Sequence, residues 1–407
     1  GEVRRSSPGA RSGAHGRRRT RRCGTGVFAT FAAFVLVLVV TGASTAGLRA
    51  DGSRPAPSSL FAAGVDTLLL VGDAGAPAAA EPVLEALAAE AAKGPERTLV
   101  VFLGDNLYPN GLPPEGAASR AEGERRLAAQ ADAALRAGAR VLFLPGNHDW
   151  DGMGKDGLAA VLRQERFLLP RSPRLLFAPG DGCPGPLLLP TPSGITLAVL
   201  DTQWWLQHEG PRPEGAGSPC SAKDAEEAMA QLKTAASAGP LALLTHHPLA
   251  SGGPHGERTR DWKAHVFPLR DAHPSFWVPI PGLGSAWVAY RGRKGTGQDL
   301  ASRRYRQLRS DLASALAGRP ALFQASGHDH SLQVLEAPVP EARWVLISGS
   351  GIFPSGRVVS KLASTRYATS RAGFLRARLE RGRAPHLEVL EVTSEGKAEE
   401  RLSLDLR

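Results

Sequence analysis

Five apolar segments of this chain each end in a short loop that carries carboxylate, amide or imidazole groups. Val71 is followed by GDAG, Leu103 by GDNLY and Leu144 by PGNHDW; later, Leu244 is followed by THHP and Ala325 by SGHDH. In open α/β sheets the carboxyl ends of the strands form the ligand crevice. We therefore expect these five loops to share one site.

The segments between these loops alternate between strand and helix patterns, an order that predicts parallel strands joined by crossovers. After Gln333 the pattern changes to short strands and turns, and it ends in an amphipathic hairpin near Leu387–Leu404. Strands are expected at Val65–Val71, Thr98–Leu103, Val141–Leu144, Ile195–Leu200, Leu241–Thr245 and Leu322–Gln324, and helices at Ala78–Ala92, Arg120–Ala137, Ala222–Ala238 and Ser302–Ala317.

The side chains in and near the five loops are typical metal ligands. Imidazoles mixed with carboxylates and an amide suit Zn, Fe, Mn or Co, whereas calcium prefers oxygen ligands alone. There are more of these groups than one ion can use, and a carboxylate can bridge two ions that lie about 3.5–4 Å apart. The candidates are Asp73, Asp105, Tyr108, Asn147, His148, Asp149, His246, His247, His255, His328, Asp329 and His330.

The series GDxG, GDxxY, GNHD, a histidine closing a strand, and GHxH resembles the calcineurin-like metallophosphoesterase superfamily. The tyrosine is similar to that of the purple acid phosphatases, and HHPLASGGPHG resembles their small tartrate-resistant branch. The resemblance spans about residues 66–355, and it implies a four-layer α/β/β/α sandwich within a domain at 64–407. Residues 256–299 form a longer stretch than that branch has, and we call them the insertion.

The resemblance assigns one metal ion to Asp73, Tyr108 and His330, and it makes Asp105 the bridge between two ions. The first ion is expected to be ferric iron. A tyrosine binds as phenolate near neutral pH only to a strongly Lewis-acidic ion, which is the physical reason for that preference.

The resemblance assigns the second, divalent ion (Fe, Zn or Mn) to Asn147, His246 and His328. His148 and His255 would then face the phosphate, stabilise it and protonate the leaving oxygen. The implied reaction is hydrolysis of phosphate monoesters by in-line attack of a metal-bound hydroxide. Asp149 and Asp329 are expected to orient ligand imidazoles from behind.

Two alternative functions remain open at this point. The same scaffold also suits a phosphodiesterase or a nucleotide pyrophosphatase. A non-catalytic, membrane-tethered binding module with an inactive metal site is the third interpretation, which the complete set of ligand-type residues opposes.

The N-terminal region explains most of the net charge of +10. Residues 1–26 hold eight arginines against one acid, Glu2, and read as a basic, disordered cytoplasmic tail. The uncharged residues 27–48 read as a transmembrane anchor or a signal segment, and 49–63 as a linker. The domain that follows is therefore expected outside the cytoplasm, membrane-anchored or secreted (periplasmic in a bacterium), and no specific nucleic-acid binding is expected.

Two further features leave alternatives open. Cys183 and Cys220 flank a predicted strand and would form a disulfide in an oxidising compartment, or remain free. The aromatic segment from Trp262 to Tyr290 suits an apolar lid, a membrane-facing patch or a packed cover over the sheet edge. His247 is expected to support the loop before Pro248.

Overall fold

The computed structural model describes residues 64–256, 262–271, 276–293, 295–354 and 358–407, which belong to one compact unit, Ser53–Arg407. The predicted tail (1–26), anchor or signal segment (27–48) and linker (49–63) lie outside the described residues. Within the described part, no helix is both long enough and apolar enough to cross a bilayer.

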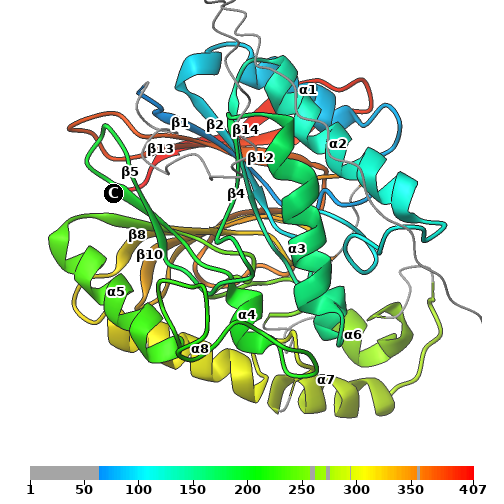
Figure 1. Cartoon of the computed structure of the whole chain (residues 1–407). Helices are drawn as coiled ribbons and strands as arrows, with labels where there is room; N and C mark the ends of the chain where they lie inside the picture. The colour runs from blue at the N-terminus through cyan, green and yellow to red at the C-terminus, as the bar shows by residue number, and fades with distance from the viewer. Residues whose placement is uncertain (1–63, 257–261, 272–275, 294, 355–357) are drawn as a thin grey trace, which may run out of the picture. The chain divides into compact units, whose positions relative to one another are not determined.

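Two mixed seven-stranded sheets form the centre of the described chain (Figure 1). The first has the order β14-β13-β12-β1-β2-β3-β4 and the second the order β11-β9-β10-β8-β7-β6-β5. The strands of the first sheet are β1 (Thr67–Val71), β2 (Thr98–Leu103), β3 (Arg140–Leu144), β4 (Leu175–Phe177), β12 (Gly373–Arg378), β13 (His386–Val392) and β14 (Ala398–Asp405). Those of the second are β5 (Leu187–Pro190), β6 (Thr196–Val199), β7 (Leu241–Leu244), β8 (Ala321–Ser326), β9 (Leu332–Val339), β10 (Ala342–Ser348) and β11 (Thr365–Thr369).

The alternating faces of the strands explain how the sheets pack. In β1, Leu68 and Leu70 join an apolar cluster with Leu244 and Phe323 of the second sheet, so this cluster lies between the sheets. Leu69 and its outward-facing equivalents belong to a second cluster that includes the helices. Strands buried on both faces read as continuous apolar runs, which is the pattern seen in the sequence.

Helices cover the outer faces of both sheets. In Figure 1, α1 and α2 lie outside the first sheet, and α5 and α8 lie outside the second. The helices are α1 (Pro82–Ala91), α2 (Arg120–Arg136), α3 (Gly157–Leu168), α4 (Thr202–Leu206), α5 (Ala225–Ala238), α6 (Trp262–Val266), α7 (Leu283–Arg293) and α8 (Arg303–Ala315). Short 3₁₀ turns are η2 (Pro95–Arg97), η3 (Asp151–Met153), η4 (Leu169–Arg171) and η5 (Pro268–Asp271).

The predicted mixed α/β class and parallel crossovers are confirmed. β1–β2, β2–β3 and β3–β4 pair in parallel, as do β6–β7 and β7–β8, and the C-terminal hairpin is the antiparallel pair β13–β14. Helix α5 begins at Ala225 rather than at the predicted Ala222, because the Asp224 carboxylate caps it by accepting the Glu227 N–H at 2.8 Å.

Helix α3 is absent from the sequence prediction. Its buried face combines the apolar side chains of Ala160, Val161 and Leu168 with two polar ones, Gln164 and Glu165. Glu165 accepts a hydrogen bond from the Asp181 N–H at 2.8 Å and thereby holds the loop that follows β4.

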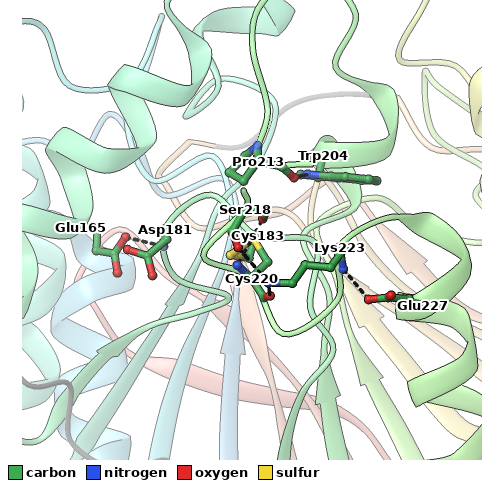
Figure 2. The surroundings of a disulfide bond; sticks show 9 residues. All are labelled: Glu165, Asp181, Cys183, Trp204, Pro213, Ser218, Cys220, Lys223 and Glu227. Atoms are coloured by element: carbon green, nitrogen blue, oxygen red, sulfur yellow. Dashed lines mark hydrogen bonds between the residues drawn. A yellow bond between two sulfur atoms is a disulfide. The ribbon is translucent and has the colours of Figure 1, made fainter. Parts of the chain in front are cut away.

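Cys183 and Cys220 form a disulfide, which decides the alternative that the sequence leaves open (Figure 2). It joins the loop after β4 to the loop before α5. Because β4 belongs to the first sheet and α5 leads into β7 of the second, the bond ties together segments from both sheets. Lys223 fastens the same loop, because its ammonium group donates to the carbonyls of Ser218 at 2.8 Å and Cys220 at 2.7 Å.

Candidate metal centre

The five polar loops lie at the carboxyl ends of β1, β2, β3, β7 and β8, and backbone hydrogen bonds join them to one another. The Asp73 N–H donates to the Gly104 carbonyl at 3.0 Å, and the Gly327 N–H donates to the His246 carbonyl at 3.1 Å. The Gly72 N–H donates across the sandwich to Ser348 at 2.7 Å. Backbone hydrogen bonds therefore join the loops of both sheets at this edge of the sandwich.

The backbone is strained where the predicted ligands sit. Of the seven non-glycine residues with positive φ in the described part, three are Asp73 (58°), Asp105 (53°) and His328 (70°). Such conformations cost of order 1–3 kcal/mol each and persist where the surroundings impose them, commonly at functional sites.

Glycines let the loops approach this closely. A Cβ on Gly146 would lie 2.4 Å from the Asp105 backbone nitrogen, and one on Gly104, where φ is +90°, would lie 2.5 Å from His246 Nδ1. Both positions therefore need glycine for the loops after β2, β3 and β7 to meet.

The first donor set consists of Asp73, Tyr108 and His330. Tyr108 Oη lies 3.1 Å from Asp73 Oδ1 and 3.1 Å from His330 Nε2, and that nitrogen lies 3.4 Å from Asp73 Oδ1. The ligand atoms of Asp73, Asp105 and His330 lie within 4.8 Å of one another. A phenol, an imidazole and two carboxylates thus converge on one point.

The electrostatics of this set are those of an anionic cluster. Burial and the neighbouring Asp105 raise the pKa of Asp73 well above its ordinary value. Desolvation and the two carboxylates raise the pKa of Tyr108. Burial alone would also raise the pKa of Asp105, but His246 and His148 outweigh it and hold that pKa below the ordinary value. A bound cation would relieve the repulsion between these groups.

The second donor set consists of Asn147, His246 and His328. His246 donates Nδ1–H to the Leu103 carbonyl at 2.8 Å, and His328 donates Nε2–H to the Gln298 carbonyl at 3.0 Å. Burial lowers the pKa of both imidazoles, so each is neutral and keeps one lone pair. Those lone pairs, on His246 Nε2 and His328 Nδ1, face Asn147 Oδ1 at 3.0 and 3.1 Å. Three atoms with lone pairs thus face one another, and together they could coordinate a cation.

Asp105 lies between the two sets. Its Oδ1 is 3.4 Å from His246 Nε2 and accepts the His148 N–H at 2.9 Å, while its carboxylate also belongs to the cluster with Asp73 and His330. This placement fits the bridging role that the resemblance implies.

His247 lies close to His246 and His328 but has no lone pair to offer. Its Nδ1 is 2.8 Å from Thr202 Oγ1, and its Nε2 is 2.7 Å from Gln298 Oε1. Because Gln298 Oε1 can only accept, His247 Nε2 carries the proton, and Nδ1 of the neutral ring accepts the hydroxyl proton of Thr202. His246, His247 and His328 lie close enough to share a metal ion, but the hydrogen bonds of His247 exclude it as a metal ligand.

His148 and His255 line a cavity of about 290 Å³ over the two donor sets. Their side chains are 36% and 31% exposed, whereas that of His246 is 0% exposed, which separates groups that can meet a solute from groups that cannot. His148 donates Nδ1–H to the Pro109 carbonyl at 2.5 Å, and His255 donates Nδ1–H to Asp299 Oδ1 at 3.0 Å.

Asp149 and Asp329 differ from the sequence expectation, because their carboxylates hold backbone instead of orienting imidazoles. Asp149 accepts the N–H groups of Asn106, Leu107 and Gly146 at 2.7–3.1 Å, and so fastens the β2 and β3 loops together. Asp329 Oδ1 accepts the His255 N–H at 3.0 Å, and its buried Oδ2 has no hydrogen-bond partner among the described residues.

Sequence reasoning misses three residues that support the site. Backbone carbonyls of Leu103 and Gln298 orient the ligand imidazoles, and the carboxylate of Asp299 orients His255. Arg291 also donates Nε–H to Asp299 Oδ2 at 2.9 Å. Gln298 and Asp299 end the insertion as part of the polar segment GQD (297–299), and only their polarity could have drawn attention to them.

Comparison with known proteins adds little. No protein-family model and no curated protein matches the chain. Among solved structures, GAP50, the anchor in the inner membrane complex of Plasmodium, is 16% identical with a TM-score of 0.49, covering 83% of this chain and 87% of that one. The purple acid phosphatase PPD1 from yellow lupin seeds is 12% identical with a TM-score of 0.49; the match covers 84% of this chain but only 53% of the lupin chain. Likenesses this weak establish neither a family nor an activity for this chain.

Proposed function

We propose that this protein hydrolyses phosphate monoesters with the help of two metal ions, in the manner of a purple acid phosphatase. The observation that carries the proposal is the convergence of two largely buried donor sets with Asp105 between them. The second set leaves acceptor atoms facing one another, and the first brings two carboxylates together with a phenol and an imidazole; both arrangements are unfavourable without a cation.

In this proposal Asp73, Tyr108 and His330 hold a ferric ion, and Asn147, His246 and His328 hold a divalent ion (Fe, Zn or Mn). Two such ions, when bound, supply Lewis acidity that lowers the pKa of water towards about 7 and offsets phosphate charge. Tyrosine binds as phenolate near neutral pH only to a strongly Lewis-acidic ion, and this is the reason for proposing ferric iron beside Tyr108.

His148 and His255 then act on the substrate directly. Each has Nδ1 engaged with a protein acceptor, so Nε2 is the atom available to the cavity. From there the two imidazoles bind phosphoryl oxygens, and one of them delivers a proton to the leaving alkoxide.

The test is metal analysis combined with turnover of a matched pair of esters. Protein expressed with iron and zinc or manganese should contain two ions per chain and should cleave p-nitrophenyl phosphate faster than bis(p-nitrophenyl) phosphate. Faster diester cleavage would overturn the choice in favour of a phosphodiesterase. Metal-replete protein that turns over neither ester would favour a binding module. Tyr108→Phe should bleach any visible absorption of the iron form.

We also propose that the domain works outside the cytoplasm. The Cys183–Cys220 disulfide supports an oxidising compartment. Attachment through residues 27–48, by an anchor that is kept or a signal that is removed, rests on the sequence pattern alone.

A further inference from the structure

The insertion contains a second cavity, of about 710 Å³, within the size range of sites for small organic ligands. Its walls come from η5, α7 and the loop after α7, and they are mostly apolar. The lining residues are Pro268, Leu269, Leu283, Ala286, Trp287, Tyr290, Arg291 and Thr296.

The carboxylate of Asp299 is hydrogen-bonded both to residues that line this cavity and to a residue that lines the cavity of the candidate metal centre. Arg291 and Thr296 line the cavity, and both donate to Asp299 Oδ2, at 2.9 and 2.7 Å. The other oxygen of Asp299 accepts Nδ1–H of His255, which lines the cavity over the two donor sets. The Arg291–Asp299–His255 chain is therefore a piece of wall that the two cavities share.

The charge of that wall is balanced on the side of the larger cavity. The guanidinium of Arg291 is hydrogen-bonded to Asp299, and the two groups neutralise each other. Among the described lining residues, this neutral wall adjoins the apolar side chains of Leu283, Ala286 and Trp287 and offers no unpaired charge to an ionic group. It favours an apolar one.

Helix α7 also presents aromatic surface that the protein does not cover. The rings of Trp287 and Tyr290 stack with centroids 5.8 Å apart, yet these residues are 37% and 49% exposed. Exposed aromatic surface of this kind, next to a cavity, marks a binding site more often than a structural feature.

We propose that this cavity binds the apolar alcohol portion of the phosphate ester whose phosphate lies at His148 and His255. The inference rests on the proposed function and adds its substrate class: monoesters of alcohols that carry an alkyl or aryl chain. The phosphate would lie on one side of Asp299 and the chain on the other, with Trp287 in contact with the chain.

The experiment compares hexyl phosphate with glycerol phosphate, two alkyl monoesters that differ mainly in the polarity of the alcohol. Metal-replete wild type should prefer hexyl phosphate in kcat/KM. Trp287→Ala should lower the ratio of the two kcat/KM values about tenfold, the effect of re-exposing roughly two methylenes. Trp277→Ala is the matched control, because Trp277 lies in the insertion, is 51% exposed and does not line the cavity.

A binding measurement supplies a readout without turnover. Hexylphosphonate, which cannot be hydrolysed, should change the tryptophan fluorescence of the wild type saturably, and Trp287→Ala should lose that change. Methylphosphonate should give a smaller change in both proteins, because it carries no chain.

The outcomes separate this inference from the proposed function. Turnover of both esters with a ratio that Trp287→Ala leaves unaltered would overturn the cavity assignment and keep the hydrolase. A ratio lowered equally by Trp277→Ala would overturn it too, in favour of general adsorption to the aromatic surface. Turnover of neither ester would overturn the proposed function and this inference with it.

Discussion

The loops around the candidate metal centre and the insertion (256–299) hold their side chains by opposite means. In the loops, most of the polar side chains are buried and held by hydrogen bonds, as His246 is by the Leu103 carbonyl. In the insertion, most of the described aromatic residues are exposed and contact one another, as Trp287 and Tyr290 do with ring centroids 5.8 Å apart. Eight of the eleven large apolar residues exposed in the described part lie between Trp262 and Tyr290.

In the proposed function, this difference separates reaction chemistry from recognition. Groups that must hold a charge or a proton need positions that neighbouring elements enforce. Surfaces that select a substrate can vary without disturbing those positions, which is why they occur on loops and excursions. Asp299 is where the two regions meet.

The largest expected effect falls on two adjacent residues of the site. His148→Ala should lower kcat about 10²–10⁴-fold while both metal ions are retained, because it removes a group that faces substrate. Asn147→Ala should instead deplete the divalent ion and leave iron. Elemental analysis beside kcat measures both. Metal loss in the His148 variant with full occupancy in the Asn147 variant would contradict the roles proposed here.

Deleting one aromatic ring in each region tests the structural side of the comparison. Phe143 is 0% exposed and stacks on Phe102 with centroids 4.5 Å apart, so Phe143→Ala should lower the free energy of unfolding by about 3–5 kcal/mol. Trp262 is 64% exposed, and Trp262→Ala should change it by less than about 0.5 kcal/mol. Urea unfolding measures both. A large loss on removing Trp262 would mean that the insertion is part of the core.

The disulfide is the next test, because it lies in the sandwich and outside the insertion. Replacing Cys183 and Cys220 together by serine should lower the free energy of unfolding by about 2–4 kcal/mol, since the bond closes a loop between residues 37 apart. kcat should stay close to that of wild type below the unfolding transition, because neither cysteine lines the site cavity. Loss of activity in folded protein would show that the bond positions the site.

Asp299→Asn tests the junction between the two regions. It should lower kcat about 10–100-fold with KM for a small ester little changed, as expected when a partner that orients a reacting imidazole is weakened. Asp311→Asn is the matched control, because Asp311 is on α8 and only accepts a surface hydrogen bond from Gln307 at 2.8 Å. An effect on KM alone would assign Asp299 to binding instead of positioning.

The same variant has a pH signature. Burial raises the pKa of Asp299, but hydrogen bonds from His255 and Arg291 outweigh it and hold the pKa below the ordinary value. A carboxyl whose pKa is depressed by folding stabilises the protein above its unfolded pKa of about 3.9 and loses that contribution as the pH falls. The stability difference between wild type and Asp299→Asn should therefore be constant above about pH 5 and shrink in acid. A difference that grows in acid would have the wrong sign.

Much of the fold and many of the site's neighbours follow from local pattern. β2 occupies the predicted Thr98–Leu103, and Asp73, Asp105 and Asn147 come together because each follows a parallel strand of one sheet. The partner of Asp149 does not follow from local pattern. Its position after Asn147 and His148 suggests a residue that orients an imidazole, but its carboxylate accepts backbone N–H groups of the β2 loop. The sequence predicts which loops lie near Asp149, but it does not predict which groups bond to its carboxylate.

The chain's own order of residues determined the strands, their parallel pairing and the edge at which the polar loops meet, because periodicity and strand-end chemistry are properties of neighbouring residues. Only the tertiary structure decided that His247 is engaged by Thr202 and Gln298, and that Asp299 is the partner of His255, 44 residues away. Those pairings arise when distant segments close on one another, and no local pattern encodes which donor then meets which acceptor.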